Sequence, residues 1–225
     1  MPTFDLVKTH EVADLLFVER EQRDSNWVRR FYQSVGDAGM VTTPEQVLEG
    51  PDGFSYFVLN MPSPERNFEL LSAAQVLDFC LENSLGLVVE PFPEPPERVI
   101  SFGQLWSKKQ LGRFDVFLEP YPDNEVPTGL NTPEIPINLA GKQAVLAGQP
   151  SESYFPAFAR NAVRKFLVEQ GIQSPGALLL CEPREKPTET IVFSVFAEDF
   201  AENTQFENLM QRLSWFFPPH YRLSS

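Results

Sequence analysis

The chain has 225 residues, 42% of them hydrophobic, which allows one large domain or two domains of about 100 residues and excludes disorder throughout. Its formal net charge is −13, with the acidic excess concentrated in residues 41–100. Because nucleic acids and anionic lipid surfaces are bound mainly through Lys and Arg, this charge argues against both kinds of partner.

The first half of the chain contains two predicted helices, and two of its predicted strands can be given bounds. In residues 25–36, large apolar side chains recur every three or four positions, and Asp24 or the serine after it can cap the helix. The next helix, over 72–84, begins with the Ser-x-x-Gln spacing of a capping box. Between them, residues 54–61 are apolar on both alternating faces, which is typical of a central strand covered on both sides, and residues 86–90 form a second strand.

The second half contains two predicted helices, and three of its predicted strands can be given bounds. The helix over 154–171 carries an unbroken apolar stripe, and a second helix over 205–217 is rich in Leu, Met and Phe on one face. Strands are predicted at 143–148 and 177–182. Residues 190–197 are apolar on both faces and are predicted to form a central strand.

The two halves run in the same order, helix, strand, strand, helix, strand, over residues 25–90 and 155–224. With the strand at 143–148 in front, the second half becomes β-α-β-β-α-β, the order of the ferredoxin-like split unit. Duplication and convergence on a common layered unit both explain the parallel. We therefore predict an α/β (α+β) protein of two small domains. The predicted parts are an N-terminal domain over 1–119, a Pro-rich linker over 120–138 and a C-terminal domain over 139–225.

Four prolines fall within six residues at 91–96. Pro93 and Pro96 have the P-x-x-P spacing that proline-reading domains bind, but glutamates surround them, whereas such grooves favour a nearby basic residue. Strand-like residues precede and follow the segment. We interpret it as a rigid connector inside one domain, rather than as a partner ligand or a domain linker.

Residues 139–183 read LAGKQAVLAGQPSESYFPAFARNAVRKFLVEQGIQSPGALLLCEP: a strand, a turn, an amphipathic helix and a short apolar strand. The turn consists of Gly148, Gln149 and Pro150. Together with the later strand TIVFSVFAEDF and a closing helix that runs into FFPPHYRLS, this run resembles the C-terminal domain of the enhanced serine sensitivity (SseB) family. In the first half, SLGLVVEP is similar to a Gly-Leu-apolar-Asn-Pro strand of that family, with Glu90 where Asn is typical.

The resemblance implies a two-domain protein of a bacterial cytoplasm, in a family without an established reaction, so no catalytic residue is carried over. The turn itself has an alternative interpretation, because any turn needs a glycine and a rigid exit. A cytoplasmic location also agrees with the cysteines: Cys80 and Cys181 lie in apolar patterns and are interpreted as buried thiols. The N-terminal stretch shows no secretory signal, and no run approaches the ~18 apolar residues of a membrane helix.

The sequence lacks the motifs of the common catalytic and cofactor sites, including the nucleophile elbow and the phosphate loop. The two histidines, His10 and His220, lie at opposite ends of the chain. Acidic pairs near 182–185 and 198–199 lie beside turns, where solvated carboxylates are the usual finding. We therefore predict no catalytic residue, no metal and no cofactor.

Two surface features are candidate interaction sites. Arg160, Arg164 and Lys165 have the helical spacing of one positive strip, which binds an acidic partner or is simply a solvated face. On the closing helix, Trp215 lies about 180° from Phe206 and is predicted to point away from the core face. It anchors an interface with a partner or a second copy of the chain, or it is covered by the C-terminal tail.

These patterns favour a non-catalytic binding or regulatory protein that acts through a protein partner or by self-association. The alternative is an enzyme whose acids and polar groups converge only in three dimensions, on a carboxylate-based or small-molecule site. A deep pocket with two or more buried carboxylates or a histidine would favour the enzyme. A flat apolar patch without such groups would favour the binding protein.

Overall fold

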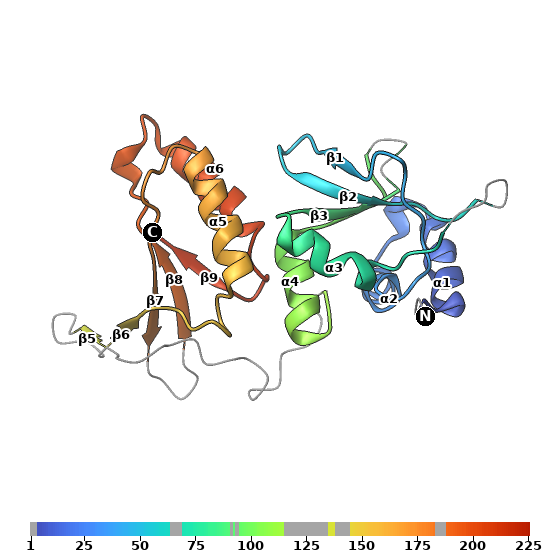
Figure 1. Cartoon of the computed structure of the whole chain (residues 1–225), viewed down its shortest axis with the longest axis horizontal. Helices are drawn as coiled ribbons and strands as arrows, with labels where there is room; N and C mark the ends of the chain where they lie inside the picture. The colour runs from blue at the N-terminus through green and yellow to red at the C-terminus, as the bar shows by residue number, and fades with distance from the viewer. Residues whose placement is uncertain are drawn as a thin grey trace. The chain divides into compact units, whose positions relative to one another are not determined.

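The chain forms two compact units, residues 1–118 and 119–225, each with helices and one mixed β-sheet (Figure 1). This confirms the predicted α/β class and the two-domain organisation. Most of the predicted linker lies outside the described residues, but Ile135–Ile137 within it form a strand, so the second sheet begins earlier than predicted. The computed structural model describes residues 4–63, 69–90, 92, 95–114, 135–137, 145–182 and 188–225.

Unit 1 has a four-stranded sheet in the order β1-β2-β3-β4. The outer pairs, β1–β2 and β3–β4, are antiparallel, and the central pair, β2–β3, is parallel. Its elements in chain order are α1 (Leu6–Leu16), the 3₁₀ turn η1 (Arg20–Gln22), α2 (Ser25–Val35), β1 (Val47–Glu49), β2 (Ser55–Leu59), α3 (Ala73–Glu82), β3 (Gly86–Val89), β4 (Arg98–Ile100) and α4 (Phe102–Leu111).

Side-chain caps fix the starts of these helices. As predicted, Asp24 accepts a hydrogen bond from the backbone N–H three residues later (2.8 Å), and Ser72 and Gln75 form a capping box at α3. The same box recurs at α4 between Ser101 and Gln104. The helices α1 and α4 were not predicted, because their apolar residues are less clearly confined to one face than those of α2.

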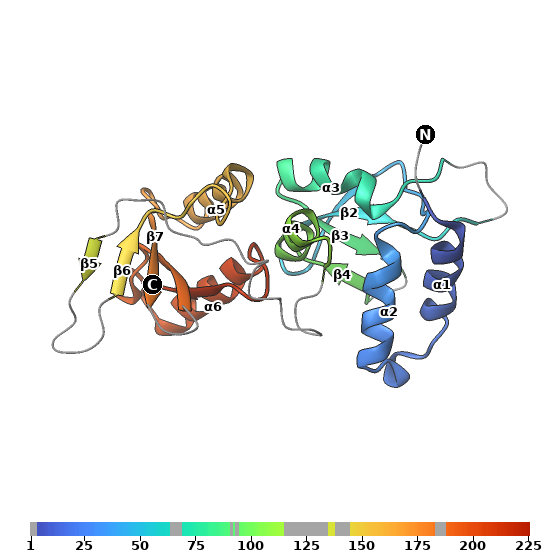
Figure 2. The same cartoon turned by 90° about the horizontal axis from the view of Figure 1, so that it is seen from below.

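The core of unit 1 covers both faces of its central strands. β2 is buried at four of its five residues and β3 at all four, which confirms the central strand predicted over 54–61. α1 packs along α2, as Figure 2 shows, and α3 packs across α4. The largest fully buried side chains of this unit are Trp106, Phe31, Phe102, Phe114, Met40, Leu59, Leu81, Leu87, Ile100 and Leu105.

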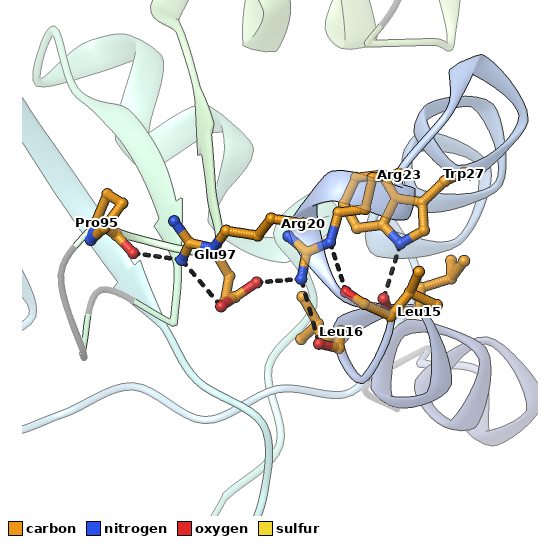
Figure 3. Close-up of polar contacts among 8 residues, drawn as sticks. Leu15, Leu16, Arg20, Arg23, Trp27, Pro95 and Glu97 are labelled. Carbon is orange, nitrogen blue, oxygen red and sulfur yellow. Dashed lines mark hydrogen bonds and ion pairs between the residues drawn. The ribbon is translucent and has the colours of Figure 1, made fainter.

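The proline-rich segment lies between two paired strands of unit 1, which confirms the connector interpretation. β3 and β4 are antiparallel neighbours, and the N–H of Glu97 donates to the carbonyl of Glu90 across the base of the connection (3.0 Å). Arg20 donates to the carbonyl of Pro95 (2.5 Å) and to the carboxylate of Glu97 (3.0 Å) (Figure 3). The connection is thus held by an arginine from the turn before α2.

A second arginine ties the same hairpin to the end of α1. Arg23 donates to Glu97 (2.6 Å) and to the carbonyl of Leu16 (3.3 Å), and its guanidinium lies 4.7 Å from the ring centroid of Trp27. The indole N–H of Trp27 donates to the carbonyl of Leu15 (2.7 Å), as Figure 3 shows. The ends of α1, α2 and the β3–β4 hairpin are therefore joined in one polar cluster, which we call the Glu97 cluster.

Unit 2 has a five-stranded sheet in the sequential order β5-β6-β7-β8-β9. The first three pairs are antiparallel and β8–β9 is parallel. Its elements are β5 (Ile135–Ile137), β6 (Val145–Gly148), α5 (Ala157–Glu169), β7 (Ala177–Glu182), β8 (Thr188–Phe193), the 3₁₀ turn η2 (Ala197–Asp199), α6 (Asn203–Ser214) and β9 (Arg222–Ser224).

The predicted β-α-β-β-α-β order is present from β6 to β9, but the arrangement is not that of a split unit. In a split unit a third strand separates the two strands of each β-α-β element, whereas here β6 and β7 are neighbours, and so are β8 and β9. β7 pairs with its hairpin partner β8 on one side and with β6 on the other, so no further strand can pair with β7.

The expectation that residues 190–197 form a strand covered on both faces was wrong. β8 ends at Phe193, and burial alternates along it. Leu179 and Ile191 pair on the buried face, whereas Leu178, which pairs with Val192 on the other face, is 38% exposed. Around β7 and β8 the sheet of unit 2 is therefore buried on one face and partly exposed on the other, although the sequence is apolar on both.

Candidate functional sites

Four of the residues singled out in the sequence lie around one cleft in unit 2, which we call the unit 2 cleft. They are Gln149 and Pro150 of the predicted turn, and Arg160 and Arg164 of the predicted basic strip. The cleft has a volume of about 370 Å³. Its remaining lining residues are Phe155, Asn161, Val163, Leu167, Pro175, Gly176, Ala177 and Phe193.

Local structure explains how the cleft is assembled. Gln149 and Pro150 directly follow β6, while Arg160 and Arg164, one helical turn apart, lie on the same face of α5. The carboxylate of Glu152 pairs with Arg160 and also accepts a hydrogen bond from the first N–H of α5 (2.6 Å). The charge of Arg160 is therefore already matched by a carboxylate of the same unit.

Arg164 differs from its neighbour on the helix. It is exposed, and among the residues that the structure describes it has neither an ion pair nor a hydrogen bond. The amides of Gln149 and Asn161, also exposed, likewise make no hydrogen bond within the described chain. Beneath them the cleft is apolar, since Leu167 and Phe193 are almost fully buried. The arrangement suits a ligand with an anionic group on an apolar body.

The other predicted site residues lie outside this cleft. Gly148 ends β6 and is buried opposite Leu179, while Lys165 is exposed on α5 and does not line the cleft. The basic strip therefore contributes two of its three residues. Trp215 is the C-terminal cap of α6; its ring is half-buried and packs edge-on against Phe216, with 4.9 Å between centroids. Its role as an interface anchor stays a prediction.

A second cleft, the unit 1 groove, runs beside α1 and has a volume of about 560 Å³. The sequence reasoning missed it because α1 was not predicted; the spacing of Leu6, His10, Ala13 and Phe17 along one helical face is the signal that was available. The groove is lined by Leu6, Thr9, His10, Ala13, Leu16, Phe17, Met61, Pro62, Leu70 and Glu90.

Glu90 is the one carboxylate among the described lining residues of this groove. It is half-buried, and one of its oxygens accepts a hydrogen bond from the N–H of Met61 (2.5 Å). Burial raises the pKa of Glu90 above its ordinary value, the negative charge of Glu97 raises it further, and the hydrogen bond from Met61 opposes both. The groove thus contains a carboxylate whose charge is poorly compensated by its surroundings.

The remaining candidates for chemistry give no site in the described part of the chain. Cys80 and Cys181 are buried and lie in different units, as predicted, and burial raises the pKa of Cys80 to about 12. Asp199 accepts a hydrogen bond from the N–H of Phe196 (3.2 Å) in the η2 turn. Over the described residues, no group of three or more His, Cys, Asp and Glu is placed to hold a metal ion, and no helix is long and apolar enough to cross a membrane.

Comparison with known proteins adds nothing to this geometry. No protein-family model matches the chain, and searches of curated proteins and of solved structures find no match. The resemblance to the SseB family rests on the quoted residues of the sequence and stays a prediction.

Proposed function

We propose that the chain is a non-catalytic binding or regulatory protein and that the unit 2 cleft holds the anionic group of its ligand. The observation that carries this proposal is Arg164, a guanidinium without an ion pair in the described chain, above an apolar floor. In a protein of net charge −13, a cation that none of the many described carboxylates engages is available to an external anion. Its planar fork suits a carboxylate or phosphate.

The composition of the cleft favours binding over catalysis. None of its described lining residues is a His, Asp, Glu, Cys, Lys or Tyr, the side chains that transfer protons or attack substrates. Arginine binds anions but does not give up its proton. The volume falls within the roughly 300–1,000 Å³ typical of ligand sites. Membership of the SseB family and a bacterial cytoplasmic location belong to the same proposal, supported by the turn that ends at Pro150.

The enzyme alternative draws on the unit 1 groove, because a carboxylate of raised pKa and a histidine are general acid–base groups. His10 is exposed at the rim, and the described lining of the groove has one carboxylate rather than two. We therefore place binding first and keep the enzyme as the second candidate.

Titration calorimetry with a short peptide that ends in Leu-Phe tests the proposal, using the free carboxylate and the amidated form as a matched pair. The full chain should bind the carboxylate form at least ~10-fold more tightly than the amide. Arg164→Ala should remove that difference, whereas Lys165→Ala, a charge-matched control outside the cleft, should retain it. Equal binding of both peptide forms, or equal effects of the two substitutions, would overturn the proposal.

A second readout uses the native cell. Affinity purification with the wild-type chain and with the Arg164→Ala variant should recover a partner with the first and not with the second. A partner that both recover equally binds elsewhere on the protein and contradicts the role of the cleft.

A further inference from the structure

The unit 1 groove presents an apolar surface to solvent. Its lining includes Leu6 at the start of α1, Phe17 at the C-terminal cap of α1, and Met61 and Leu70 from the chain outside that helix. Leu6 is 59% exposed and Phe17 is 87% exposed. Single exposed apolar side chains are common, but two large ones on the rim of one apolar groove are typical of a binding surface.

Three of the described lining residues have polar side chains, and one of them is fully occupied. The hydroxyl of Thr9 donates to the carbonyl of Asp5 (2.8 Å) and accepts from the N–H of Gly39 (2.8 Å). It joins the start of α1 to the backbone after α2 and is buried. Thr9 therefore has a structural role, which leaves His10 and Glu90 to interact with a ligand.

His10 contributes an acceptor. Its Nδ1 lies 2.8 Å from the carbonyl of Leu6, and because a carbonyl only accepts, Nδ1 must carry the proton. In the neutral ring this makes Nε2 an acceptor. Glu90 contributes another: one oxygen is used by Met61, and the other accepts no hydrogen bond from any residue described. The polar atoms of the groove that remain open are therefore acceptors, which suits a donor.

Among the residues that the structure describes, none supplies Glu90 with a counter-ion. Arg20 and Arg23, the arginines of the Glu97 cluster, both pair with Glu97, at 3.0 and 2.6 Å. No described basic side chain forms an ion pair with Glu90, and Glu97 adds a like charge. Because a partly buried carboxylate is costly without a cation, this position favours a positively charged ligand.

The backbone at Glu90 is also unusual. Its φ of 48° lies in the left-handed region, which costs a residue other than glycine about 1 kcal/mol or more. Two backbone hydrogen bonds hold Glu90 in this conformation. Its N–H donates to the carbonyl of Leu59 (2.9 Å), and its carbonyl accepts from the N–H of Glu97 (3.0 Å). Strained residues that the surrounding structure fixes in this way are concentrated at functional sites. The residue in this conformation is the one whose carboxylate lines the groove.

We propose that the unit 1 groove binds a small molecule with a protonated amine on an apolar body. The ammonium group donates to the open oxygen of Glu90, with Nε2 of His10 as a further acceptor at the rim. The apolar body lies against Leu6, Leu16 and Phe17. The groove volume of about 560 Å³ is that of a small-molecule site. This site is independent of the unit 2 cleft, so each proposal can fail without the other.

Titration calorimetry on the full chain tests the charge and the apolar body separately. The probes are 2-phenylethylamine, 2-phenylethanol (the same body without charge), 3-phenylpropionate (opposite charge) and ammonium chloride (charge without a body). We expect 2-phenylethylamine to bind at least ~10-fold more tightly than each of the others. Equal binding of the alcohol, tighter binding of the acid, or no amine binding up to about 10 mM would overturn the proposal.

Variants locate the site. Glu90→Gln keeps an oxygen for the N–H of Met61 but removes the charge, and it should weaken amine binding at least ~10-fold. Asp14→Asn, on an exposed position of α1 outside the groove, removes the same charge and should leave binding unchanged. Phe17→Ser should weaken binding with little effect on folding, because this side chain is 87% exposed.

Loss of binding in Glu90→Gln has one trivial explanation, an unfolded variant, and thermal melting excludes it. Because the folded protein raises the pKa of Glu90, its charged form is disfavoured on folding, and removing that charge should leave the melting temperature equal or higher at pH 7. A variant that melts normally and still binds the amine as the wild type does would contradict the site.

Discussion

The two units contain the same five-element core with the same strand pairing. In unit 1 it is α2-β1-β2-α3-β3, and in unit 2 it is α5-β7-β8-α6-β9. In each, the first two strands are antiparallel and the third is parallel to the second. The similarity expected from the sequence thus extends to hydrogen-bond topology. The units differ in what is added: α1, β4 and α4 in unit 1, and β5 and β6 in unit 2.

The added elements decide whether the shared helix is covered. When α2 and α5 are aligned at their first residues, the eighth residue is Tyr32 in unit 1 and Arg164 in unit 2. Tyr32 is buried and its hydroxyl accepts hydrogen bonds from Arg98 of β4 (2.7 Å) and Gln104 of α4 (2.8 Å). Arg164, in a unit without counterparts of β4 and α4, lines a cleft. A common core thus has a structural residue and a candidate binding residue at corresponding positions.

The largest effect should come from truncating the two cores separately. Phe31→Ala and Leu167→Ala each remove a fully buried side chain and should cost about 3–5 and 2–5 kcal/mol respectively. Hydrogen exchange should show lost protection in β2 and β3 for the first variant, and in β7 and β8 for the second. If either variant loses protection in both units, they fold as one cooperative body and the comparison fails.

Unit 1 alone has the Glu97 cluster, so Glu97→Gln should destabilise that unit by about 1–3 kcal/mol at pH 7. Burial alone would raise the pKa of Glu97, but hydrogen bonds from Arg23 and Arg20, and their charges, lower it below the ordinary value. A lowered carboxylate pKa stabilises the fold above the pKa of the unfolded chain, and that stability is lost as the pH falls through the folded pKa.

Urea denaturation from pH 7 down to about pH 3 measures this contribution. The difference between wild type and Glu97→Gln should shrink on acidification. Glu49→Gln, an exposed carboxylate on β1, is the control and should change stability little at any pH. A constant difference across this range would mean that the glutamine variant disturbs packing rather than charge.

The corresponding helix positions, Tyr32 and Arg164, allow a direct test in which the expected changes in stability are smaller. Tyr32→Phe leaves Arg98 and Gln104 without their shared acceptor and should cost about 1–2 kcal/mol. Arg164→Ala removes an exposed side chain and should change stability by less than about 0.5 kcal/mol. Equal destabilisation in urea melts would make Arg164 a structural residue and remove the contrast between the units.

The smallest change is expected when the native protein is treated with a cysteine reagent at pH 8, because both thiols should react slowly. Cys80 is fully buried with a pKa of about 12, so it should react only when unit 1 unfolds. Cys181, at 8% exposure, should also react slowly in the native protein. Mass spectrometry after labelling with and without denaturant measures the reaction of each thiol separately. A disulfide between Cys80 and Cys181 in the native protein would contradict their placement in separate units.

Helices and strands with strong local signals could be predicted before the structure was known. Apolar stripes and caps, such as Asp24 and the box of Ser72 with Gln75, predicted α2 and α3, and the apolar run at 177–182 predicted β7 to the residue. The shared order of helix, strand, strand, helix and strand was predicted for both halves, whereas α1 and α4 were not. Such predictions succeed because the interactions that form a helix or start a strand lie within a few residues along the chain.

Which of these elements pack against one another could not be predicted in the same way. The sequential strand order of unit 2, the open face of β8 and the covering of Tyr32 depend on contacts between residues far apart in the chain. The same holds for both sites: Gln149 and Arg164 line one cleft although they belong to different elements, and Glu90 lines a groove beside α1 although it lies far from that helix in the chain. Local sequence patterns do not predict which distant residues line the same site. The packing between elements, rather than the propensity within each element, fixes the geometry of such a site.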